Sequence, residues 1–214
     1  MSLSVVSICN RALDLLGADP IASLADDSKA ARLCQRNYDG VRDSVLRAYP
    51  WNSAMFRATL PTMLASPAFG YRFQYQLPTG PEPAMCLRVY QVIGSDDYRI
   101  EGRRLLSNDP PPLSILYIGQ VIDPNQFDPL LAETIAARLA VYLAANLTES
   151  SSRIDTMRQH YREVLVEARA MDAQEGRAGQ IYHLSLPLLM GGNGHPAFMG
   201  ALICPNTKMR AAPC

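Results

Sequence analysis

The chain has 214 residues, of which 48% are hydrophobic and 19% charged, enough for one sizeable core or a core with a small subdomain. Its 20 basic and 20 acidic residues cancel, which argues against a strongly basic surface that would bind nucleic acid tightly. The five cysteines are odd in number, widely spaced and form no C-x-x-C pair, so we expect free thiols in a reduced cytoplasmic product rather than disulfides or a zinc site. No charged region precedes the first apolar residues and no apolar run reaches membrane length, so we expect a soluble protein without a membrane segment.

The first fifty residues predict two helices. Ser4 is a suitable N-cap for the first helix, and Gly17 stands where a glycine ends many helices. Residues 26–28 offer a second N-cap, and Pro50 ends the helix that follows. Trp51 is the only tryptophan, and at a helix exit we interpret it as a core residue rather than a ligand platform.

From about residue 54 to residue 121 the apolar pattern changes from helical spacing to alternation. The alternating segments are 71–77, 86–93, 98–106 with a turn at Gly102, and 113–121. Sequential strands joined by short loops predict an antiparallel sheet or a small barrel, inserted between the second and third helices.

The stretch 127–150 predicts a central helix that begins at Asp128 and Pro129. Its apolar stripe consists of Leu131, Ile135, Leu139, Leu143 and Leu147. Alanines occupy most of its other faces, which favours close packing by neighbouring helices on several sides. Because Glu133 and Arg138 interrupt it, we interpret it as the central rod of a bundle and not as a membrane span.

A fourth helix is predicted to begin at residues 150–152. Its apolar stripe consists of Ile154, Met157, Tyr161, Val164, Ala168 and Met171. Its expected solvent face carries Arg153, Asp155, Arg158, Arg162, Glu163 and Arg169. An amphipathic pattern of this kind predicts that the helix packs on the central rod.

The expected fold class is therefore α+β and mainly α. It is a four-helix bundle with an antiparallel sheet or small barrel between helices two and three, followed by an extended C-terminal arm. The expected divisions are residues 1–53 for the first two helices, 54–122 for the β insertion, 123–176 for the last two helices and 177–214 for the arm.

The arm is expected from an unusual composition. Residues 176–214 contain no acidic residue, are rich in apolar side chains, and carry glycines and prolines that prevent long helices. Such a segment either folds back onto its own domain or lies in a groove of a neighbouring subunit or partner, and we favour the second. The two docking segments would be 181–190 and 197–204, with residues 191–194 as the hinge between them. The residues expected to contact the partner are Ile181, Tyr182, Leu184, Leu186, Leu188, Leu189, Met190, Phe198, Met199, Leu202 and Ile203.

No catalytic or cofactor motif stands out. The histidines His160, His183 and His195 lack metal-ligand spacing, and the glycine-rich segment 191–195 lacks the Lys-Ser/Thr ending of a phosphate loop. Glu101, Glu133 and Glu163 are candidate hydrolase carboxylates, but nothing in the sequence selects them. We therefore expect an interaction protein rather than an enzyme, with no catalytic residues, no cofactor and no metal.

Eight short segments, in their order along residues 3–176, resemble the phage head-to-tail adaptor family, also called tail tubular protein A or gatekeeper-ring proteins. They are Pro50-Trp51, Tyr75-Gln76-Leu77-Pro78, Cys86-Leu87-Arg88-Val89, Ile100-Glu101-Gly102, Leu116-Tyr117-Ile118, Asp123-Pro124, Phe127-Asp128-Pro129-Leu130 and the run from Ala170 to Gly176. Each segment is unspecific alone, and the resemblance lies in their order and spacing.

The resemblance implies a structural virion protein at the head–tail junction, present in the host cytoplasm during assembly. It implies a homo-oligomeric ring, typically of about twelve copies, docked beneath the portal protein and followed by a tail nozzle or stopper protein. C-terminal arms would grip the portal, and double-stranded DNA would pass through the channel without sequence-specific binding. The chain's neutrality suits such a passage, because tight phosphate binding would oppose sliding.

Residues on helices two and four are candidates for contacts between ring subunits. They are Arg32, Arg36, Asp39, Arg42, Arg158 and Arg162. For any one of them, an ordinary solvated position is the alternative. For the whole chain, the alternatives are another head-completion ring such as a stopper or terminator, a small carboxylate hydrolase, and a cellular helical binding module.

Overall fold

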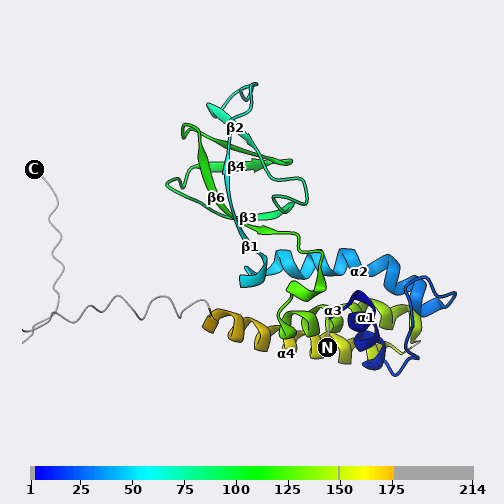
Figure 1. The fold of residues 1–214 in the computed structure, drawn as a ribbon. Coiled ribbons are helices and arrows are strands. Elements are labelled where there is room, and N and C mark those ends of the chain that lie inside the picture. Colours follow the sequence, from blue (N-terminus) through cyan, green and yellow to red (C-terminus); the bar gives the residue numbers. More distant parts are fainter. Residues whose placement is uncertain (1–2, 149, 176–214) are drawn as a thin grey trace, which may run out of the picture. The chain divides into compact units, whose positions relative to one another are not determined.

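A computed structural model of the chain describes residues 3–148 and 150–175 (Figure 1). The fold is α+β, with four helices and two small antiparallel sheets that lie in sequence between the second and third helices. The helices are α1 (Val5–Asp14), α2 (Lys29–Ala48), α3 (Pro129–Leu147) and α4 (Ser151–Glu175). The strands are β1 (Met55–Leu60), β2 (Phe73–Gln76), β3 (Cys86–Val92), β4 (Tyr98–Glu101), β5 (Arg104–Ser107) and β6 (Leu113–Gly119). The predicted arm, 177–214, lies outside the described residues.

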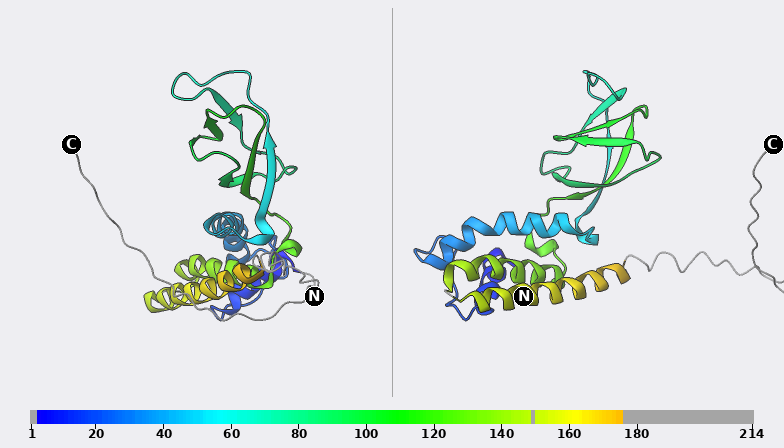
Figure 2. Two further views of the ribbon diagram at one scale, coloured as in Figure 1. Left: turned by 90° about the vertical axis from the view of Figure 1, so that its left-hand side faces the viewer. Right: turned by 180° about the vertical axis from the view of Figure 1, so that it is seen from behind.

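Helix α3 is the core of the helical part. Leu131, Ile135, Leu139 and Leu143 are each 0% exposed, because α1, α2 and α4 all pack against this helix. The views in Figures 1 and 2 agree in placing α2 and α4 on different sides of α3. The predicted central rod is confirmed.

Among the described residues, α3 is also the one helix long and apolar enough to cross a membrane by length and composition. Core helices of soluble proteins have the same properties, and most of α3 is covered by its neighbours. The apolar faces of α3 are thus explained by packing within the chain.

The predicted helix starts are confirmed by side-chain caps. Ser4 forms a reciprocal capping box with Ser7, and the Ser28 hydroxyl accepts a 3.0 Å hydrogen bond from the backbone N–H of Ala31. At α3, the Asp128 carboxylate accepts a 2.8 Å hydrogen bond from the backbone N–H of Leu130. These caps satisfy backbone donors that have no partner within the helix.

The β insertion consists of two three-stranded sheets, in the orders β1-β6-β3 and β2-β5-β4, with all neighbours antiparallel. The β4–β5 hairpin turns at Gly102, whose φ of +60° favours glycine, as the sequence predicts. The two sheets share an apolar core that includes the fully buried Tyr75, Leu105 and Tyr117. Strand β1 lies outside the four predicted segments, because it is an edge strand in which only Leu60 is buried and alternation is weak.

Two details of the predicted burial pattern are wrong. On α4, Met171 is 49% exposed, whereas Arg169 turns away from solvent and lies over the Tyr49 ring, 5.3 Å from its centroid. On β2, the predicted polar position Gln74 is buried while Phe73 is only half-buried. In both places a neighbouring segment distant in sequence covers the residue: the end of α2 at Arg169 and the loop after β1 at Gln74.

We predict that Leu139→Ala lowers the free energy of unfolding by about 2–5 kcal/mol, because it leaves a cavity where α3 packs against its neighbouring helices. Val166→Ala on α4 is the control, since Val166 is 68% exposed and its loss should change stability by less than about 0.5 kcal/mol. Urea unfolding of both variants measures the difference, and equal stabilities would contradict the central role of α3.

Candidate functional site

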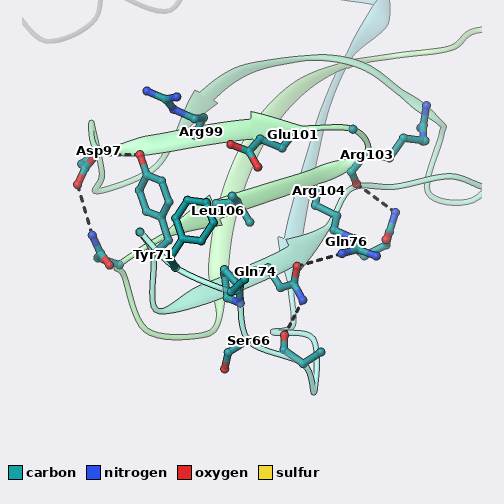
Figure 3. Close-up of a pocket in the computed structure, with 17 residues that line it drawn as sticks. Ser66, Tyr71, Gln74, Gln76, Asp97, Arg99, Glu101, Arg103, Arg104 and Leu106 are labelled. Atoms are coloured by element: carbon teal, nitrogen blue, oxygen red, sulfur yellow. Dashed lines mark hydrogen bonds between the residues drawn. The ribbon is translucent and has the colours of Figure 1, made fainter.

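A hollow with a volume of about 1100 Å³ lies on the β insertion (Figure 3). One side is the loop 65–71, and the floor is the polar face of the β2-β5-β4 sheet. Strand register builds this floor, because it sets Gln74 and Arg99 on either side of Leu106. The next row places Gln76 and Glu101 on either side of Arg104.

Gln74 holds the loop against this floor. Its side chain is 5% exposed, and its amide nitrogen donates a 2.6 Å hydrogen bond to the carbonyl oxygen of Ala65. Its amide oxygen accepts from Arg104 at 3.3 Å. Sequence reasoning missed this role, because a glutamine in an alternating strand is equally compatible with a solvated position.

Charged groups of both signs line the hollow, and some of them already form hydrogen bonds with other parts of the chain. Arg103 donates to the carbonyl oxygens of Pro78 at 3.0 Å and Cys86 at 3.3 Å, so its guanidinium supports the insertion. Arg99 and Glu101 are exposed on β4, an edge strand. The lining residues include no cysteine, histidine or lysine, and the Tyr71 hydroxyl donates a 3.5 Å hydrogen bond to the Asp97 carboxylate.

The cysteines Cys9, Cys34 and Cys86 are free thiols, as expected for the described part of the chain, and all three are buried. Cys9 and Cys34 lie side by side between α1 and α2, and the hydrogen bond to Cys34 together with burial raises the pKa of the Cys9 thiol. Burial also raises the pKa of Cys86. The thiols Cys9 and Cys86 are therefore protonated and behave as small core residues.

Five of the six predicted inter-subunit residues lie on the surface. Arg32 is exposed and pairs with Asp27, and Arg158 is exposed and pairs with Asp155 at 3.1 Å. The remaining exposed members are Arg36, Asp39 and Arg162.

Arg42 differs from these five because it is only 4% exposed. Its guanidinium binds Asp39 at 2.8 Å and Asp43 at 2.9 Å, and Asp43 also accepts a 2.7 Å hydrogen bond from Gln120. Arg42 thus connects α2 to the segment after β6 within one chain and is not an exposed contact residue. Because α2 carries several other charged residues, the sequence does not show that Arg42 is buried.

The end of α4 is joined to the start of the β insertion. The backbone N–H of Asn52 donates to the Asp172 carboxylate at 3.0 Å, and the Asn52 amide donates to the Asp172 carbonyl oxygen at 2.7 Å. Burial raises the pKa of the Asp172 carboxyl, the hydrogen bond from Asn52 opposes that rise, and the nearby Glu175 and Asp128 add to it. The 120 residues between the partners explain why the sequence did not reveal this contact.

The other sequence-based candidates do not come together into a reaction centre. Glu133 is paired with Arg11 at 2.9 Å, whereas Glu101 lies on β4 and Glu163 on α4. In residues 3–148 and 150–175 no three His, Cys, Asp or Glu side chains are grouped so that they could hold a metal ion. The eleven predicted docking residues between 181 and 203, and the hinge 191–194, lie outside the described residues.

Comparisons with known proteins returned no match among family models and no match among curated proteins.

We predict that Asp172→Asn changes the pH dependence of stability. Because the folded-state pKa is raised, the wild-type chain should lose stability relative to the variant as pH rises through and above the ordinary carboxyl pKa of about 3.9. Asp172→Ala is the comparison, since it removes the acceptor for Asn52 and should cost about 1 kcal/mol across the range. Urea unfolding at several pH values tests this, and a wild-type–Asn difference independent of pH would refute it.

Proposed function

We propose that this chain is the subunit of a head-to-tail connector ring, a structural virion protein that docks on the portal and continues the DNA channel to the tail. The observation that carries the proposal is the ordered set of segments that resembles the phage adaptor family. In the structure, these segments occupy the joints between the helical part and the β insertion, the strands of both sheets and the two ends of the last helix pair.

The joint at which the chain leaves α2 for the β insertion supports the proposal, because its residues have defined structural roles. Trp51 is 1% exposed, and its indole N–H donates a 3.0 Å hydrogen bond to the carbonyl oxygen of Val45. The Pro50-Trp51 pair therefore ends α2 and anchors the start of the β insertion in the helical core.

The second joint, at which the chain returns from β6 to α3, is also anchored in the helical core. Ile118, Val121 and Phe127 belong to the same apolar core as α3, so the chain leaves β6 and re-enters the helical core before α3 begins. The segments Leu116-Tyr117-Ile118 and Phe127-Asp128-Pro129-Leu130 lie at either end of this return. A sequence pattern placed at buried joints constrains the fold, so these segments support a shared fold.

The charge balance is compatible with a DNA passage. Three of the 20 basic residues and none of the 20 acidic residues lie after position 175. Residues 1–175 therefore carry 17 basic and 20 acidic residues. A slightly acidic body would not hold phosphates tightly, so DNA could slide past it. The apolar, acid-free segment 177–214 would bind the portal, and the other faces would meet ring neighbours and the tail-side protein.

We predict that removing every residue after Glu175 leaves a folded body that no longer binds the portal. The described core lies entirely before this point, so circular dichroism and urea unfolding should match those of the full chain. Electron microscopy of each form mixed with portal rings of the same phage measures binding.

Two outcomes would count against the proposal. Portal rings decorated equally by the truncated and full chains would show that residues 176–214 do not dock. A full chain that forms rings but leaves the portal undecorated would favour a stopper or terminator instead.

A further inference from the structure

The outward side of α2 carries a basic strip. Lys29, Arg32 and Arg36 are exposed at helical spacing, with Gly40 one turn further on. Arg32 pairs only with the nearby Asp27, and within the described residues Arg36 makes no ion pair. We call these four residues the α2 strip.

Gly40 is unusual within this strip, because glycine disfavours the interior of a helix. A Cβ added at Gly40 would meet no atom within 4 Å, so packing inside the chain does not require the missing side chain. Gly40 lies one turn after Arg36, and at this end of the strip another surface could approach the α2 backbone closely.

The outward side of α4 carries a strip of the opposite charge. Gln159, Glu163, Val166, Glu167 and Ala170 are exposed at helical spacing, and the only charges among them are the two glutamates. Val166 is 68% exposed at the centre of this set. We call these five residues the α4 strip.

The charges of α4 run against its own dipole. Arg153 lies in its first turn and Glu175 in its last, whereas a helix is stabilised by acidic groups at its start and basic groups at its end. Glu163 and Glu167 lie in the middle of the helix, where the dipole has little effect, and neither forms an ion pair within the described residues. A basic surface on another copy would supply the opposite charge.

We infer that the α4 strip of one copy packs on the α2 strip of the next copy, so that Glu163 and Glu167 pair with Arg32 and Arg36, whose spacing of four residues they share. This inference rests on the proposed ring, and it names the surfaces that join its subunits. A contact between two different surfaces is heterologous, which is the type that closes into rings.

Within residues 3–148 and 150–175, both strips are exposed at the same time. Because α2 and α4 lie on different sides of α3, one copy can use its α2 strip and its α4 strip with two different neighbours (Figures 1 and 2). The β insertion contacts α2 at its other end, where Arg47 donates to the carbonyl oxygen of Leu87. The first three turns of α2 are thus not covered by the insertion.

Charge reversal tests the inference. Arg32→Glu/Arg36→Glu and Glu163→Arg/Glu167→Arg should each weaken self-association of the full chain at least about tenfold, because like charges then face each other. The fourfold variant should restore it, since each interface again has both signs. All four positions are exposed, so the variants should fold.

The control is Arg57→Glu/Arg99→Glu, which makes the same change in net charge as the α2 reversal at exposed positions of the β insertion. Sedimentation equilibrium at low salt, over a range of protein concentrations, measures self-association of all five proteins, and added salt should weaken it. The control should associate like the wild type.

A wild-type chain that stays monomeric at every concentration, or reversals that leave association unchanged, would overturn the inference. Portal decoration, measured in parallel, separates it from the proposed function. Strip-dependent association without portal binding would overturn the connector function and keep this interface. Portal binding by the full chain, together with equal self-association of all variants, would keep the connector function and overturn this interface.

Discussion

The burial of α3 is the interaction on which the rest of the described chain depends. Helices α1, α2 and α4 all contact α3, whereas the contact between α1 and α2 is minor. The same core takes in Trp51 and Val121, at the two points where the chain leaves the helices and returns to them. Because α3 buries leucines on one side and alanines on the others, it can pack against all of these neighbours at once.

Polar contacts complement this core at the joints. The Arg42–Asp43–Gln120 network connects α2 to the segment after β6, and the Asn52–Asp172 pair connects the other joint to α4. Both contacts bring together residues far apart in sequence, and both involve a charged group removed from much of the solvent. Such groups must be paired, since an isolated buried charge would be costly.

The helices were predictable because their signals are local. Ser4, Ser28 and Asp128 cap the helices they precede, and the spacing of the α3 leucines marks its buried face. Gly102 likewise marks the β4–β5 turn. Arg42 and Gln74 were not predictable, because tertiary neighbours decide whether a polar side chain is covered. The surface strips needed the structure too, since only the fold shows which charges have no ion-pair partner among the described residues.

The position of the β insertion has a consequence for biosynthesis. Helices α1 and α2 leave the ribosome before the insertion, and the helix that must cover their apolar faces follows only at Pro129. The β core contains no residue from the helices, so it can form during translation while the first two helices wait. The helical core would then close last, when α3 docks on α1 and α2 and α4 follows it, and the nascent chain would expose those apolar faces until that moment.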